Sequence, residues 1–134
     1  MADSPFDWSE YFRLAQELAR RADEASVRSA ISRAYYFVYH LALKRAAANN
    51  FSLKLDEGTH AQLWVVFSGN PEPDCQWLGV IGNRLRDRRV RADYKVNFPR
   101  IREEVPGVIA DAQEFANRLG RLDPRHPNPG SIRR

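Results

Sequence analysis

The sequence is poor in the residues that build disulfide-bonded or metal-bound scaffolds. Its 134 residues include one cysteine, Cys75, which cannot form an internal disulfide and cannot build a thiolate metal site alone. No apolar run approaches the ~18–20 residues that span a bilayer. The opening segment Met1–Pro5 has neither the basic start nor the apolar core of a secretory signal. We therefore expect a cytoplasmic protein that is held together by its core and has no membrane partner.

Several catalytic motifs are also missing. The sequence has no glycine-rich phosphate loop, no serine in a nucleophile-elbow context, and no His, Asp and Glu cluster at metal-ligand spacing. Nucleotide hydrolases, serine hydrolases and metalloenzymes therefore lack their usual parts here. We expect a protein that needs no cofactor and no metal.

The composition is that of one soluble globular domain, with 43% hydrophobic and 28% charged residues. Its basic charge is concentrated: residues 84–95 hold six basic residues and two acids, so this segment alone accounts for the formal net charge of +4. A local positive segment is typical of a phosphate-binding surface, although a solvated helix face is an alternative. The arginines that we expect to bind nucleic acid are Arg84, Arg86, Arg88, Arg89 and Arg91.

The spacing of apolar residues predicts helices throughout. Apolar side chains recur three and four positions apart, which is the helical period, and no alternating run long enough for a strand is present. The expected helices span 8–21, 24–48, 59–67, 73–92 and 102–122. The fold class is therefore all-α, with four main helices and one short one in a single domain over 1–122. Residues 123–134, which contain three prolines, predict a Pro/Arg-rich flexible tail.

A polar stripe follows the long second helix. Its members recur at positions that place them along one side of the helix, and they are Ser29, Arg33, Tyr36, His40 and Lys44. The stripe lies beside an apolar face that we expect to enter the core. It faces solvent, a groove or a partner subunit, and the spacing alone does not choose between these.

Three residues of the stripe have side chains suited to phosphodiester cleavage without a metal. The guanidinium of Arg33 can hold a phosphate through two hydrogen bonds and stabilise charge that builds on it. The imidazole of His40 can move a proton to or from a ribose hydroxyl, and Tyr36 can position the phosphate or stack on a base. The other two histidines are weaker candidates for catalysis, because His60 fits a surface or capping role and His126 lies in the tail.

Two segments, Ser32–His40 and Arg88–Tyr94, carry motifs of a known family. The first reads S-R-A-Y-Y-F-V-Y-H and resembles the S-R-A-Y-Y-x-x-F-H stretch of small prokaryotic HEPN-domain proteins of the UPF-type branch, with Tyr39 in place of the usual phenylalanine. The second resembles the R-x-x-A-D-Y motif of that branch, with Arg89 on its arginine. The resemblance extends from about Trp8 to Leu122 and includes the order of the expected helices.

The resemblance implies a HEPN-like up-and-down four-helix bundle with an extra short helix, commonly assembled as a homodimer. Many HEPN proteins are metal-independent endoribonucleases of toxin–antitoxin, antiviral defence or CRISPR-linked systems. Their usual catalytic arginine and histidine are separated by four to six residues in the late helices. Here no histidine follows the arginines of the fourth helix, and Asp93 and Tyr94 stand where one is expected.

Arg33 and His40 have the spacing of that motif, with six residues between them, but they lie on the second helix. A catalytic role for this helix is one interpretation. His40 is then the general acid and base, and Tyr36 positions the phosphate. Arg33 and Arg89 hold that phosphate, and Asp93 orients His40 or Arg33 through a charge-assisted hydrogen bond.

A purely structural role is the alternative for the same residues. Arg33 and Asp93 then form an ion pair between two helices, and Tyr36 and Tyr94 pack over it.

Two functions from different classes follow from the resemblance. The first is an RNA-directed HEPN protein that acts as a metal-independent endoribonuclease. The alternative is a non-catalytic HEPN module that binds RNA, a nucleotide or a partner protein of the same system. A structural dimerisation bundle is a third function, for which Trp64 and Trp77 would have to be exposed together.

Overall fold

The chain folds into α-helices, as the sequence predicts. The computed structural model describes residues 4–54, 56 and 58–131, and within these ranges it contains five α-helices, one short 3₁₀ turn and no β-strand. Each expected helix is present, with ends that fall within two residues of the predicted ones. The elements are α1 (Ser9–Ala19), α2 (Glu24–Ala48), α3 (Thr59–Ser68), α4 (Pro73–Tyr94), α5 (Ile101–Arg121) and the turn η1 (Pro129–Ser131).

Capping side chains explain where the two longest helices begin. Asp23 precedes α2, and its carboxylate accepts a hydrogen bond from the backbone N–H of Ser26 at 2.9 Å. Glu72 precedes α4 and accepts from the N–H of Cys75 at 2.8 Å, while Pro73 occupies the first turn. Such caps satisfy N–H groups that have no partner inside the helix, and a proline at this position loses no hydrogen bond.

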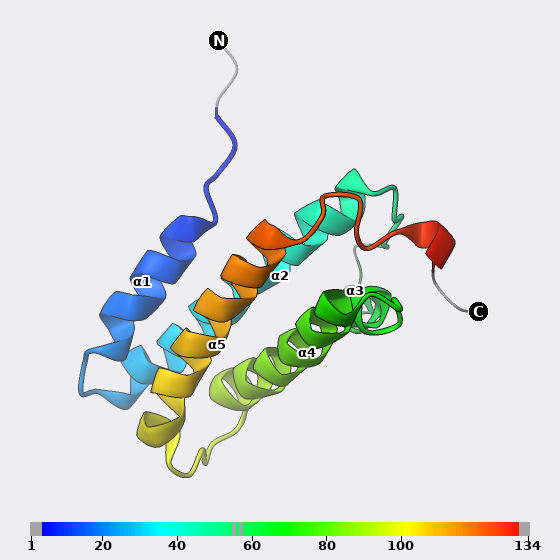
Figure 1. Ribbon diagram of the computed structural model, residues 1–134. Helices are drawn as coiled ribbons and strands as arrows, with labels where there is room; N and C mark the ends of the chain where they lie inside the picture. Colours follow the sequence, from blue (N-terminus) through cyan, green and yellow to red (C-terminus); the bar gives the residue numbers. More distant parts are fainter. Residues whose placement is uncertain (1–3, 55, 57, 132–134) are drawn as a thin grey trace.

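The long helix α2 forms the centre of the bundle and contacts α1, α4 and α5. Figure 1 shows α1 and α4 running in one direction and α2 and α5 in the opposite one, with α3 beside the start of α4. No helix within the described ranges is both long and apolar enough to cross a membrane. The largest side chains of the core are completely or almost completely buried, and they include Ile31, Tyr35, Val38, Leu63, Phe67, Leu78, Leu85 and Phe115.

Two glycines allow α3 to lie directly on α4. A Cβ atom at Gly79 would collide with the backbone of Ser68, and one at Gly82 would collide with the indole ring of Trp64. Glycine is required at both positions, because α3 already fills the space that a side chain would need. This close approach carries Trp64 into the core, where its indole N–H reaches the hydroxyl of Tyr35 on α2.

Arg28 fastens the end of α4 to the first half of α2. Its Nη1 donates to the carbonyl oxygens of Ala92 at 2.9 Å and Lys95 at 2.6 Å, and its Nη2 donates to that of Val96 at 3.0 Å. The last carbonyls of a helix have no partner within it. A cation at this end therefore satisfies them and interacts favourably with the helix dipole.

Arg45 makes the corresponding contact from the second half of α2. Its guanidinium donates to the carbonyl oxygens of Leu119 at 2.9 Å, His126 at 3.0 Å and Asp123 at 3.3 Å. The first of these carbonyls lies in the last turn of α5, and the other two lie beyond its end. Arg45 thus holds the segment after α5 against the bundle.

The segment after α5 is more closely packed than its composition suggests. The sequence predicts a flexible tail over residues 123–134, of which residues 123–131 are described. In this part Pro127 is completely buried, and the side chain of Asn70 donates to the carbonyl oxygen of Asn128 at 3.4 Å. The anchoring groups belong to α2 and to the loop before α4, so the composition of the segment itself gives no sign of these contacts.

Candidate functional site

The N-terminal part of the chain covers much of the polar stripe predicted on α2. The ring of Trp8 stacks on that of His40, with centroids 3.4 Å apart and 7° between the planes. The guanidinium of Arg33 lies over the ring of Tyr11, 4.9 Å from its centroid. Burial lowers the pKa of His40, which keeps its imidazole uncharged at neutral pH. Two of the three predicted catalytic residues therefore pack against α1 and the residue before it.

Tyr36, the third of these residues, faces α4. The guanidinium of Arg89 lies 5.4 Å from the centroid of its ring. The ring of His60, from α3, is 6.2 Å away and nearly perpendicular to it, and His40 is 6.4 Å away. The structure thus brings Tyr36 and Arg89 together, whereas Arg33 packs on α1.

Asp93 bonds to α2 through Ser32. The Ser32 hydroxyl donates to the Asp93 carboxylate at 3.2 Å, and Nη1 of Arg89 lies 3.9 Å from the same oxygen. Tyr94 is 72% exposed. Among the ion pairs of the described residues, Asp93 pairs with Arg89, so the alternative of an Arg33–Asp93 pair beneath Tyr94 is not what the fold contains.

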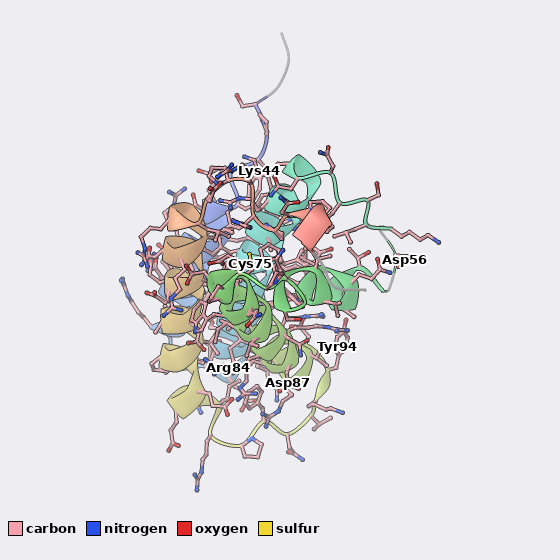
Figure 2. The ribbon with its side chains drawn as sticks, turned by 45° about the vertical axis from the view of Figure 1, so that its right-hand side comes forward. Lys44, Asp56, Cys75, Arg84, Asp87 and Tyr94 are labelled. Carbon is pink, nitrogen blue, oxygen red and sulfur yellow. The ribbon has the colours of Figure 1, made fainter. Side chains whose placement is uncertain are left out.

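The five arginines predicted as one basic surface are divided among several neighbours. Arg84 and Arg88 form ion pairs with acidic side chains of α5 at 2.8 and 3.3 Å. Arg91 lies over the ring of Phe98, 4.5 Å from its centroid. Figure 2 shows Arg84 and Tyr94 on different sides of α4. Because these arginines spread around the helix, three of the five point away from the surface that faces Tyr36.

The side chain of Arg89 is almost completely removed from solvent. The residue is 7% exposed, and its Nε is buried with no hydrogen-bond partner. The Asp93 carboxylate, at 3.9 Å, is beyond hydrogen-bond distance, and the guanidinium lies over the rings of Tyr35 and Tyr36. A buried guanidinium with an unused donor destabilises a fold. Buried charged groups that lack a partner are concentrated at functional sites. Arg89 is therefore the strongest candidate for binding an anion.

The burial of Arg89 could have been predicted from its position in the apolar period of α4, although a charged residue is not expected there. Residues of α4 that enter the core recur three and four positions apart, as Leu78, Gly82, Leu85, Arg89 and Ala92. Arg89 therefore stands where this period places a core side chain. A charged residue at such a position is rarely buried without a partner.

His60 belongs to the same cluster and is not a free surface residue. Its Nδ1 lies 2.6 Å from the hydroxyl of Tyr35, and the indole N–H of Trp64 donates to that hydroxyl at 3.2 Å. The ring of Tyr39 stacks on His60 with centroids 4.3 Å apart. Trp64 is 2% exposed, so the exposed patch considered for Trp64 and Trp77 does not form.

The two hydrogen bonds of Tyr35 determine which nitrogen of His60 carries a hydrogen. An indole N–H can only donate, so the Tyr35 oxygen accepts from Trp64. Tyr35 is completely buried, and burial raises the pKa of its phenol, so the hydroxyl keeps its hydrogen and donates it to Nδ1 of His60. In a neutral imidazole the other nitrogen, Nε2, then carries the hydrogen and is a donor.

We expect His60 to stay neutral until the pH falls to about 4. Its pKa is lowered from 6.5 to about 4, first by burial and then by the nearby charges of Arg89, Arg86 and His40. In the unfolded chain His60 binds this proton near pH 6.5. Between pH 6.5 and about 4 the unfolded state therefore binds more protons than the folded state. The free energy of unfolding attributable to His60 is therefore lost as the pH falls from 6.5 to about 4. An NMR titration of the His60 ring measures this pKa directly.

The variant His60→Gln provides the control, because glutamine keeps a side-chain N–H donor and cannot be protonated. Urea denaturation of the variant should show a smaller loss of stability between pH 6.5 and 4 than that of the wild type. A folded-state pKa near 6.5 for His60 would contradict the burial and charge environment described above.

We name Tyr36, His60, Arg86 and Arg89 the Arg89 site. Arg86 is half-buried on α4 and close enough to lower the pKa of His60. The site thus combines two guanidinium groups, the Nε2–H of a neutral histidine and a partly exposed tyrosine ring. Charged planar donors of this kind match the oxygens of a phosphate. Over residues 4–54, 56 and 58–131, no group of three or more His, Cys, Asp and Glu side chains could hold a metal ion.

Comparison with known proteins assigns no family to this chain. No protein-family model matches the sequence, and no curated protein or solved structure matches it either. The resemblance to HEPN proteins therefore rests on Ser32–His40 and Arg88–Tyr94 and on the order of the helices. A fold does not determine a function, so the function is inferred from the geometry of the Arg89 site.

Proposed function

We propose that this chain is an RNA-directed protein of the HEPN type, in which the Arg89 site binds a phosphate of the RNA backbone. The observation that carries the proposal is the buried guanidinium of Arg89, whose Nε has no hydrogen-bond partner. A phosphate oxygen that accepts from the accessible part of this guanidinium would compensate the buried charge. The ligand would remove a free-energy cost that the unbound protein bears.

The aromatic side chains beside the guanidinium favour a nucleic acid strand over a free phosphate ion. Tyr36 is partly exposed, and its ring lies 5.4 Å from the Arg89 guanidinium. Rings that stack on unpaired bases, next to cations that hold the backbone, are a common recognition surface for single-stranded RNA. The HEPN resemblance supports RNA as the strand. It also supports a homodimer, or a complex with a partner protein, in a prokaryotic defence, CRISPR-linked or toxin–antitoxin system.

Metal-independent cleavage of the bound RNA is a second candidate function, favoured by two histidines around one tyrosine. The ring centroids of His40 and His60 lie 5.2 and 4.3 Å from that of Tyr39. Since burial lowers the pKa of His40, its imidazole can accept the proton of a ribose hydroxyl. The ribose oxygen would bond to phosphorus as the bond to the next nucleotide breaks. The departing oxygen would take up a proton, leaving a cyclic phosphate.

Incubation of end-labelled structured RNA in EDTA distinguishes the two functions. Cleavage by the wild type and not by His40→Ala would establish a metal-independent ribonuclease with His40 in its active site. Binding without cleavage by either protein would establish a non-catalytic RNA-binding module. Full cleavage by His40→Ala would contradict the role proposed for His40, and no binding by either protein would contradict both functions.

We expect the variant Arg86→Gln to bind single-stranded RNA several-fold more weakly than the wild type. Loss of one phosphate contact should also reduce the salt dependence of binding, lowering the slope of log K against log salt by about 0.7. Fluorescence anisotropy at several salt concentrations measures both quantities.

Arg84→Gln is the matched control, because it removes the same charge from the same helix. Arg84 is paired with Asp111 of α5 at 2.8 Å, on a side of α4 away from Tyr36. We expect its RNA affinity to stay close to that of the wild type. If the Arg86 and Arg84 variants lost RNA affinity equally, RNA binding would depend on the net charge of the protein and not on the Arg89 site.

A further inference from the structure

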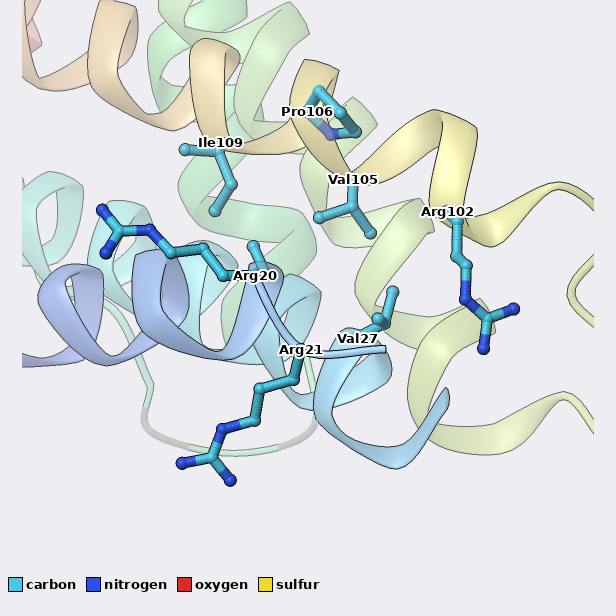
Figure 3. A pocket seen from close by; sticks show the side chains of 8 residues that line it. Arg20, Arg21, Val27, Arg102, Val105, Pro106 and Ile109 are labelled. Atoms are coloured by element: carbon cyan, nitrogen blue, oxygen red, sulfur yellow. The ribbon is translucent and has the colours of Figure 1, made fainter. Parts of the chain in front are cut away.

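A hollow lies between α5 and the turn that joins α1 to α2. It encloses about 450 Å³, which falls within the ~300–1,000 Å³ typical of small-molecule sites. Figure 3 shows Ile109 and Val105 of α5 and Val27 of α2 around this space. Val27 and Val105 belong to the buried core, so the floor of the hollow is a part of the core that a ligand can reach.

Arginines surround this apolar floor. Arg20 and Arg21 at the end of α1 and Arg102 at the start of α5 line the hollow, and its lining residues include no acidic side chain. Figure 3 shows these three side chains placed around the apolar ones. The rim therefore has positive charge, and the floor has apolar surface.

The three guanidinium groups keep donors available for a ligand. Arg102 donates through Nε and Nη2 to the carbonyl oxygen of Ala22, at 3.2 and 2.7 Å, which holds it at the rim and leaves Nη1 unused in that contact. Arg20 and Arg21 are exposed, and within the described part of the chain neither forms an ion pair or a side-chain hydrogen bond. The three side chains point in different directions from the rim (Figure 3), so an anion in the hollow would pair with one of them and be attracted by the charge of the others.

The hollow is independent of the Arg89 site. It is built from the end of α1, the start of α2 and the first half of α5, whereas the Arg89 site is built from α2, α3 and α4. The floor offers no hydrogen-bonding side chain that would recognise a base or a sugar, so a second nucleotide is a poor match for it.

We propose that this hollow binds a small amphipathic carboxylate, with the carboxylate on the positive rim to which Arg20, Arg21 and Arg102 belong and the hydrocarbon part on Val27, Val105 and Ile109. Guanidinium groups bind carboxylates through paired, charge-assisted hydrogen bonds. Apolar surface on the ligand is stabilised when the floor removes it from water. The two halves of such a molecule match the two halves of the hollow.

Decanoate, used below its micelle concentration, is the probe for this site. We expect NMR chemical-shift changes at Val27 and Ile109, and an affinity that rises about fourfold for each methylene added between hexanoate and decanoate while the chain is buried. Decyltrimethylammonium, with the same chain and a positive head, should bind at least tenfold more weakly. Equal affinity for the two head groups, or shifts confined to other parts of the protein, would overturn the proposal.

The double variant Arg20→Gln/Arg21→Gln tests the rim, and Arg13→Gln is its control. All three arginines are exposed residues of α1 or the turn after it, so neither variant removes a buried contact. We expect the double variant to bind decanoate at least tenfold more weakly and the Arg13 variant to bind it like the wild type. Unchanged affinity in the double variant would overturn the proposal, whatever the outcome of the RNA experiments.

Discussion

Replacement of Arg89 by methionine should weaken RNA binding tenfold or more while leaving the folded state at least as stable as before. Charge-assisted hydrogen bonds contribute about 1.5–3 kcal/mol each, so the loss of the guanidinium removes a large part of the phosphate contact. Methionine keeps an apolar side chain of adequate length over the rings of Tyr35 and Tyr36. It also removes a buried charge whose Nε has no partner.

The expected stability of the Arg89→Met variant differs from that of a variant that breaks an ordinary buried ion pair. Removal of one member of such a pair destabilises a protein because the other charge is left buried. Here the Asp93 side chain is 30% exposed and still accepts a hydrogen bond from Ser32, so it remains solvated and bonded. We therefore expect the free energy of unfolding to stay the same or to rise by about 1 kcal/mol.

Urea denaturation and fluorescence anisotropy measure the two effects of Arg89→Met. Arg88→Met is the control, because it removes the same charge from the neighbouring position, where the arginine pairs with Glu104 at 3.3 Å and is partly exposed. Its effect on RNA affinity should be much smaller. A loss of several kcal/mol in the Arg89 variant would identify Arg89 as a structural residue and contradict the proposed function.

Gly82→Ala should destabilise the fold by about 3 kcal/mol, at the upper end of the usual cost of overpacking. The added methyl group would collide with ring carbons of Trp64. Trp64 is 2% exposed, and its ring lies against those of Tyr35, Phe67 and Phe115, so a shift of the indole would disturb all three contacts. Displacement of the indole would break its hydrogen bond to Tyr35, so the pKa of His60 should also rise toward its ordinary value.

Gly107→Ala is the matched control for this substitution. Gly107 lies in α5, and a Cβ atom there would meet no other atom within 4 Å. Because alanine is the better helix former, this variant should gain up to about 1 kcal/mol. Thermal denaturation of the two variants provides the comparison. If Gly82→Ala were as stable as Gly107→Ala, the close packing of α3 on α4 would be contradicted.

The helices could be predicted because each is specified by residues near it in the sequence. Asp23, Glu72 and Pro73 mark two of the starts, and the apolar period marks the faces that enter the core. The segment after α5 differs in this respect. Its position depends on Arg45, more than seventy positions earlier, and no local pattern records that contact.

The candidate site could be predicted only in part, for the same reason. Tyr36 and Arg89 belong to the two HEPN-like motifs, and the fold brings them together. The contribution of His60 could not be foreseen from its own surroundings, because it depends on how closely α3 approaches α4 at Gly79 and Gly82. The charge of residues 84–95 also did not predict which arginines belong to the site, because it does not show which of them pair with acidic side chains of another helix.

Arg28 and Arg45 have a consequence for the lifetime of the folded state. Each joins α2 to backbone carbonyls between 64 and 81 positions away in the sequence. Closing such long loops is entropically costly, so contacts of this kind form late on the folding pathway. Interactions absent from the transition state slow unfolding without accelerating folding. We therefore expect the two arginines to slow the unfolding of the bundle, and with it any proteolysis that requires unfolding.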